Sequence, residues 1–467
     1  MARTLIRGGT VVTASDTYVA DVWIENGKIT SLVEVATGKH DAADEIIDAG
    51  GCYVMPGGID AHTHMSLPFG GTTASDDFAT GSIAAAHGGT TTIIDFAIQS
   101  KGSSMRAGLD AWHEKASGKA AIDYGFHLIM TEANPQTLEE MATCVREGIT
   151  SFKMFMAYPG VFLVDDQQIF RAMLRAGELG ALITMHAEIG LPIDVLVRKA
   201  LDAGHTAPVY HALTRPEVAE ATGTERAIAL AEMAKVPVYM VHLSAQRALE
   251  RVMEARDRGL PAYAETCPQY LFCSEDDLRG KDGDEWQGAG YVCTPPLRPK
   301  HHHEHLWRGL RNYDLQTVAT DHCPFCMKDQ KELGRGDFSK IPNGMPGVET
   351  RLHLLWEGVR EGKISMNRFV EITATAPAKI FGLYPRKGTI AIGADADIVI
   401  WDPNRQKTLG VKTLHMNVDY SPFEGKKVIG TPAAVLSRGE VVVKDDQWVG
   451  KRREGRGDFL RRGTFAL

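Results

Sequence analysis

Eight short apolar runs, several of them followed by a segment of helical periodicity, constrain the fold of this chain most strongly. They lie at residues 53–62, 91–97, 122–130, 149–155, 181–186, 236–242, 260–266 and 315–321. Buried parallel strands have such apolar runs, and parallel neighbours need a long crossover that is usually a helix. Eight strand–helix units predict an α/β protein built on a (β/α)8 barrel of the TIM type. An open doubly wound sheet is the alternative, but no glycine-rich dinucleotide motif follows an early strand.

Both ends of the chain have a different pattern, of short alternating strands separated by turn residues. Near the start, Asn26-Gly27 is a strong hairpin signal, and a similar strand-rich pattern returns in the last part of the chain. Neither end alone has enough strands for a stable core. We therefore expect residues 1–55 and 386–467 to form one smaller β-sandwich domain, with the barrel at 56–385. Two unrelated β tails are the alternative.

Charge and cysteine content limit the possible partners. The formal net charge is −8 and the chain has no basic stripe, which argues against binding to nucleic acid. No apolar run approaches the ~18 residues that span a bilayer, and the first residues lack the apolar core of a signal peptide. Seven cysteines without framework spacing indicate free thiols in a reducing compartment. We expect a cytoplasmic protein that acts on a small molecule.

Side chains suited to metal binding stand at the C-terminal ends of five predicted strands, where barrel enzymes carry their active sites. Alone, a histidine there is usually a satisfied core residue, and an aspartate can cap a helix. Together, at matching depths around one axis, they predict a metal site. Four imidazoles and one carboxylate form a ligand set that suits zinc. The candidate ligands are His62, His64, Lys153, His186, His242 and Asp321.

Lys153 is the unusual member of this set, because it lies within the apolar stretch GITSFKMFMAYPG. A lysine is expensive to bury as a cation. Burial beside other cations favours the neutral amine. A neutral amine can react with carbon dioxide to form a carbamate, and each carbamate oxygen could then bind one metal ion. We expect an N6-carboxylated Lys153 between two Zn²⁺ ions; a buried salt bridge is the alternative.

Four stretches, GGIDAHTH, SFKMFMAY, ATDHCPF and IPNGMPGVET, resemble the hydantoinase/dihydropyrimidinase family of the amidohydrolase superfamily, and most of all its bacterial D-hydantoinases. The resemblance covers nearly the whole chain. It implies that the six candidate ligands bind a zinc pair and that CO₂ carboxylates Lys153. It also implies that Tyr158 contacts the substrate carbonyl and that backbone groups at Thr294 and Asn343 bind the substrate. Relatives are mostly homotetramers or dimers, so a homo-oligomer is expected.

The expected activity is zinc-dependent hydrolysis of the cyclic amide bond in hydantoins or 5,6-dihydropyrimidines, which yields N-carbamoyl amino acids. A hydroxide that bridges the metals attacks the carbonyl carbon, since zinc lowers the pKa of bound water toward ~7. Tyr158 donates to the developing oxyanion, and Asp321 carries the proton to the leaving nitrogen. The candidate residues of the pocket wall are Met65, Leu67, Phe69, Phe152 and Phe162. The alternative for each of them is ordinary packing at the rim of the barrel.

Three rival functions have sequence features that count against them. A dihydroorotase would be expected to carry arginine where Ser66 stands. Allantoinases are expected to lack the equivalent of Tyr158. Another cyclic amidohydrolase of the superfamily stays an alternative. Non-enzymatic relatives of dihydropyrimidinase have lost ligands that this chain keeps. Two further motifs suggest metal binding but have simpler explanations. HHHEH at 301–305 is expected to be the solvated start of a helix. The C-x-x-C that begins at Cys323 has no second pair at zinc spacing, and because Cys323 lies close to Asp321 in the sequence it is expected to line the pocket.

Overall fold

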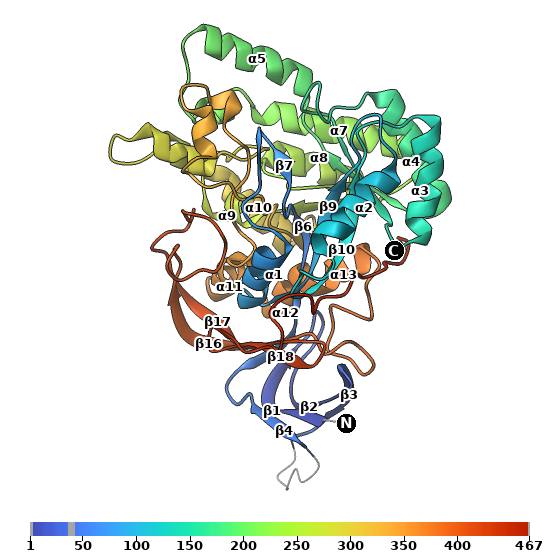
Figure 1. Cartoon of the computed structure of the whole chain (residues 1–467), viewed down its shortest axis with the longest axis vertical. Helices are drawn as coiled ribbons and strands as arrows, with labels where there is room; N and C mark the ends of the chain where they lie inside the picture. Colours follow the sequence, from blue (N-terminus) through green and yellow to red (C-terminus); the bar gives the residue numbers. More distant parts are fainter. Residues whose placement is uncertain (1–2, 36–42, 466–467) are drawn as a thin grey trace.

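The computed structural model describes residues 3–35 and 43–465, and its central feature is a sheet of eight parallel strands that closes into a barrel (Figure 1). This confirms the predicted (β/α)8 fold. The strands, each hydrogen-bonded to the next, are β6 (Gly58–Thr63), β9 (Thr90–Ile98), β10 (Asp123–Ile129), β11 (Ser151–Phe155), β12 (Leu182–His186), β13 (Val238–Met240), β14 (Ala262–Thr266) and β15 (Thr317–Val318).

Helices surround the barrel, and helix α4 (Asp166–Leu179) shows why they form where they do. Asp165 caps its first turn, its buried side chains recur at helical spacing, and Gly180 ends it with a φ of 64°. The other α-helices are α1 (Phe78–His87), α2 (Met105–Ala116), α3 (Pro135–Arg146), α5 (Gly190–Asp202), α6 (Tyr210–Leu213), α7 (Glu217–Ala234), α8 (Gln246–Asp257), α9 (Pro268–Phe272), α10 (His301–Arg311), α11 (Arg351–Arg360), α12 (Met366–Val370) and α13 (Ala376–Ile380).

The histidine-rich stretch at 301–305 begins helix α10, as predicted. It is only partly solvated, because His302 is buried and its Nδ1 accepts a hydrogen bond from the backbone of Gln246 at 3.0 Å. None of the helices within residues 3–35 and 43–465 is both long and apolar enough to cross a membrane.

The barrel closes between β6 and β15 through side chains and one isolated bridge instead of a regular ladder. Thr63 pairs with His322 in parallel, and the His64 N–H donates to the His322 carbonyl at 2.9 Å. Below this bridge, the Asp60 carboxylate accepts from the Thr320 N–H at 3.1 Å and from the Thr320 hydroxyl at 2.6 Å. The first and last strands are thus joined where they carry candidate ligands.

Arg351 supports the same seam from below. It is fully buried, and its Nη1 donates to the carbonyls of Ile59 and Val318 at 2.9 Å each. These carbonyls belong to the two strands that no ladder joins. A guanidinium with several donors can therefore satisfy both strand edges at once.

A second, nine-stranded sheet contains strands from both ends of the chain and lies below the barrel in Figure 1. Strand β5 pairs antiparallel with β16, with Val54 opposite Ile400, and so joins the two ends. Apolar side chains from both ends share one core, which excludes two unrelated tails. The strands are β1 (Arg3–Val12), β2 (Thr17–Glu25), β3 (Lys28–Val33), β4 (Glu45–Asp48), β5 (Tyr53–Pro56), β16 (Ile398–Thr408), β17 (Lys427–Ser437), β18 (Glu440–Lys444) and β19 (Gln447–Trp448).

The predicted run at 53–62 proves to be two strands, β5 in the nine-stranded sheet and β6 in the barrel. Gly57 separates them: its N–H donates to the Asp397 carbonyl at 2.8 Å. A Cβ on Gly57 would lie 2.1 Å from the Thr91 hydroxyl oxygen, so only glycine allows this crossing. The domain boundaries proposed above stay a prediction, and residues 1–2, 36–42 and 466–467 of the terminal domain lie outside the described residues.

The last described residues leave the nine-stranded sheet and run along the N-terminal ends of the barrel strands. Tyr124 and the tail exchange two backbone hydrogen bonds, with Asp458 and with Leu460. Arg462 is buried and donates to the Phe126 carbonyl at 2.6 Å and the Ser151 hydroxyl at 2.7 Å. The tail therefore covers the end of the barrel opposite the strand ends that carry the candidate ligands.

This packing predicts that Arg462→Met destabilises the fold. The substitution leaves buried acceptors without donors and should lower the free energy of unfolding by about 2–5 kcal/mol. Arg461→Met is the control. Arg461 is the exposed neighbour of Arg462, and its substitution should change the free energy of unfolding by less than about 0.5 kcal/mol. Thermal and urea unfolding measure both, and equal losses in the two variants would contradict the prediction.

Candidate active site

The six predicted metal ligands converge at the C-terminal mouth of the barrel. His62 and His64 come from the end of β6, and Asp321 follows β15 across the seam. One Asp321 oxygen lies 3.1 Å from the Nε2 atoms of both histidines. The seam therefore brings three candidate ligands together around one carboxylate.

Lys153 and two further histidines complete the cluster. Lys153 points inward from β11, and its Nζ lies 3.0 Å from the Nε2 of His62. His186 ends β12 and His242 follows β13; the Nδ1 of His186 and the Nε2 of His242 are 3.0 Å apart. These side chains are 2% exposed or less, so a compact buried set of nitrogen and oxygen donors faces the cavity.

Burial favours the uncharged, lone-pair form of several of these groups. It lowers the pKa of Lys153 to about 8 and that of His64 to about 4. Burial, with the charges of His186 and Lys153, places the pKa of His242 well below its ordinary value. Burial alone would raise the pKa of Asp321, but His62 and His64 hold it well below the usual range. Such a set is prepared to bind a cation.

Two buried carboxylates orient the candidate ligands. The Nδ1 of His62 contacts Glu265, whose other oxygen accepts from the Tyr239 hydroxyl at 2.8 Å. The Nε2 of His186 lies 2.9 Å from Glu188. A carboxylate on the outer ring nitrogen is the usual companion of a metal-binding histidine. Sequence reasoning missed both carboxylates, although Glu188 stands two residues after His186.

Three residues of this site have a left-handed backbone conformation. Tyr158, His242 and Asp321 have positive φ angles of 63°, 41° and 51°. Residues other than glycine rarely adopt this region, and they keep it only where the surrounding contacts impose it. The barrel thus holds a candidate ligand or a candidate substrate-binding side chain at each of these positions at some cost in stability.

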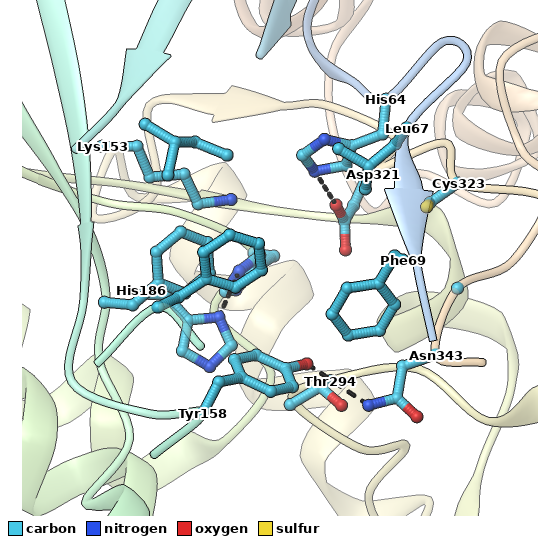
Figure 2. Close-up of a pocket in the computed structure, with 15 residues that line it drawn as sticks. His64, Leu67, Phe69, Lys153, Tyr158, His186, Thr294, Asp321, Cys323 and Asn343 are labelled. Carbon is cyan, nitrogen blue, oxygen red and sulfur yellow. Dashed lines mark hydrogen bonds and ion pairs between the residues drawn. The ribbon is translucent and has the colours of Figure 1, made fainter. Parts of the chain in front are cut away.

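A second group of polar side chains lies across the cavity from Lys153, His64 and Asp321 (Figure 2). Burial raises the pKa of Tyr158 to about 12, so its hydroxyl stays protonated and can donate. Its oxygen accepts a hydrogen bond from the Asn343 side chain at 3.3 Å. Thr294 lines the same end of the cavity.

The cavity wall is apolar, and three of the five predicted wall residues form part of it: Leu67, Phe69 and Phe162. The structure places the other two elsewhere. Phe152 neighbours Lys153 on β11, and because side chains alternate along a strand it faces the surrounding core. Met65 is fully buried with its sulfur against Gly81 of helix α1.

Two wall residues were missed, Ile129 and Phe155. Phe155 stands two residues after Lys153, so strand alternation was the signal that could have found it. Its ring stacks on Phe162 with centroids 4.9 Å apart. Cys323 lines the cavity beside Asp321, as predicted.

The described residues contain one other histidine and carboxylate cluster, formed by His87, His415 and Asp446. The two imidazole rings stack with centroids 3.5 Å apart. Their lone pairs are therefore nearly parallel and do not point toward one shared ion. The Lys407 ammonium lies 2.9 Å from Asp446 and already balances its charge. The cluster at the barrel mouth is therefore the better candidate metal centre.

Known proteins resemble the chain over its whole length. The sequence profile of the Amidohydrolase family matches residues 53–442. The D-hydantoinase of Streptomyces coelicolor is 57% identical over 465 residues, 99% of this chain and 98% of that relative. The D-hydantoinase of Geobacillus stearothermophilus is 52% identical and covers 99% and 97% of the two chains. The crystal structure of dihydropyrimidinase from Brevibacillus agri covers all of both chains, with 53% identity and a TM-score of 0.97.

The contact between Glu265 and His62 predicts that Glu265→Gln weakens metal binding. An amide cannot stabilise the His62 tautomer as a carboxylate does, and loss of such a partner typically costs ~10–100-fold in metal affinity. Chelator titration with elemental analysis measures the change. Glu349→Gln is the control: this buried carboxylate contacts His415 in the other cluster. A metal affinity unchanged in the Glu265 variant would contradict the prediction.

Proposed function

The chain belongs to the amidohydrolase family, as a hydantoinase-like cyclic amidohydrolase, and from this we propose that it opens the ring of hydantoins and 5,6-dihydropyrimidines. The products would be N-carbamoyl amino acids. One observation carries the proposal: a single cavity has a cluster of metal-type ligands on one side and the Tyr158 hydroxyl, with Thr294 and Asn343, on the other.

The residues fit a pair of zinc ions. Lys153 has no carboxylate within ion-pair distance among the described residues; its nearest polar partner is the His62 imidazole, which suits a cation poorly. A carbamate on Lys153 would remove this mismatch. In the proposal His62, His64, His186, His242 and Asp321 would hold the zinc ions, and a carboxylated Lys153 would add an anionic ligand. The bound metals supply the Lewis acidity that activates water and polarises the amide carbonyl.

The protein side chains supply the remaining chemistry. The Tyr158 hydroxyl donates to the oxygen of the attacked carbonyl as negative charge develops there. Asn343 holds that hydroxyl by its own hydrogen bond. Asp321, ionised at neutral pH, accepts the proton of the attacking water and returns it to the leaving ring nitrogen.

The shape of the cavity supports a substituted ring as substrate. An imide-like –CO–NH–CO– unit presents alternating acceptors and a donor, which suit the polar groups around Thr294 and Asn343. The wall of Leu67, Phe69 and Phe162 suits an alkyl or aryl group on the ring carbon.

A substrate panel tests the proposal. We expect 5-alkyl and 5-aryl hydantoins to be hydrolysed with kcat/KM at least ~10² above allantoin and dihydroorotate, because the ureido group of allantoin and the carboxylate of dihydroorotate would place polar groups against the apolar wall. Dihydrouracil, which has no ring substituent, should be hydrolysed as well. Product analysis should show N-carbamoyl amino acids. Faster turnover of dihydroorotate or allantoin would refute the assignment.

Lys153→Ala separates the role of the lysine from that of the oxyanion donor. This variant should lose bound zinc and activity together, and a short carboxylic acid in the buffer should restore part of both. Tyr158→Phe is the matched comparison. It should keep its zinc but lose ~10²–10³ in kcat, the usual effect of one oxyanion donor. Full zinc content and rate in the Lys153 variant would show that the lysine only packs.

A further inference from the structure

A second buried lysine, Lys331, lies beside the two segments that form the polar end of the cavity. It is fully buried and begins a short 3-10 helix, Lys331–Gly334. Its ammonium donates to the carbonyl oxygens of Val292, Pro342 and Gly344, at 3.2, 2.7 and 2.9 Å. An ammonium has three N–H donors, so each is used. Within residues 3–35 and 43–465 no carboxylate forms an ion pair with it.

The three carbonyls belong to the segments that carry the substrate-facing groups. Val292 precedes Thr294 by two residues, and Pro342 and Gly344 flank Asn343. The Gly344 N–H also donates to the Val292 carbonyl at 2.9 Å, so the two segments are joined directly as well.

The turn at Asn343 has little freedom. Gly344 has a φ of 151°, and a Cβ there would lie 2.1 Å from the Cys323 carbonyl oxygen. The position of Asn343 therefore depends on the contacts of its two neighbours, both of which accept from Lys331. A shift of this turn would move the Asn343 amide away from the Tyr158 hydroxyl that it now reaches at 3.3 Å.

A buried cation without a carboxylate is costly, and an apolar side chain would fill the same space more cheaply. It would leave three carbonyl oxygens without a donor, however. We propose that Lys331 is a positioning residue that ties the Val292–Thr294 segment to the Pro342–Gly344 turn and so sets the affinity for the cyclic substrate. The inference takes its substrate from the proposed function. The positioning itself is argued only from the hydrogen bonds of Lys331.

The test compares Lys331→Met with Lys331→Gln, and with Lys387→Met as the control. Lys387 is equally buried but holds three aspartates, Asp123, Asp395 and Asp397. Lys331→Met should raise KM for the best hydantoin substrate at least ~10-fold, because the substrate-binding groups at Thr294 and Asn343 shift. Its kcat should fall by much less than the ~10²–10³ expected for Tyr158→Phe, because the Tyr158 hydroxyl itself remains. Lys331→Gln, with two N–H donors, should lie between Lys331→Met and the wild type. Lys387→Met should lower the melting temperature but change KM less than ~2-fold.

A second readout needs no substrate. Amide hydrogen exchange in residues 290–296 and 341–346 should be at least ~10-fold faster in Lys331→Met than in the wild type, and unchanged there in Lys387→Met. If the wild type opened no hydantoin or dihydropyrimidine, the proposed function would fail while exchange still reported on Lys331.

The proposal requires both changes, with zinc content equal to that of the wild type. An unaltered KM or unaltered exchange in folded Lys331→Met would overturn it. So would equal effects in Lys387→Met, which would indicate general destabilisation. Failure of both Lys331 variants to fold would also overturn it, because the lysine would then serve the whole fold.

Discussion

Between β6 and β15 the carboxylate of Asp60 takes the place of a strand ladder, and the candidate metal centre depends on it. The carboxylate accepts from Thr320 on one side of the seam and from the His62 N–H, at 3.2 Å, on the other. It therefore fixes the backbone of a candidate ligand, His62, and of the residue just before Asp321. These hydrogen bonds contribute to the separation of His62, His64 and Asp321, and a residue without a side-chain acceptor at position 60 would remove them on both sides.

Three buried lysines show how environment decides the role of one side chain. Burial lowers the pKa of Lys153 to about 8 and that of Lys331 to about 7, but three aspartates overcome the effect of burial at Lys387 and raise its pKa. Lys387 is a stable cation that joins parts of the chain. The Lys331 ammonium donates its N–H groups to three backbone carbonyls. Lys153 faces imidazoles, which leaves its amine the one best suited to chemical modification.

The sequence predicted the features of the fold that follow from regular patterns of apolar residues. Barrel strands could be recognised because buried parallel strands are apolar along their length. The candidate ligands could be located because they stand where such strands end. The direction of side chains was harder: Phe152 was assigned to the cavity, but its neighbour Lys153 faces inward, so Phe155 lines the wall instead. Met65 lies beyond its strand, where alternation no longer applies. Glu265 and Lys331 act through contacts with residues distant in the sequence, which no local pattern records.

The nine-stranded sheet has a consequence for how the chain is made. Strand β5 is complete before the barrel is synthesised, but its partner β16 emerges only after it. At roughly 5–20 residues per second, the edge of β5 waits on the order of tens of seconds without its partner. Such an edge can pair with other nascent chains. Expression yield should therefore depend on translation speed and chaperone supply more strongly than the stability of the finished protein would suggest.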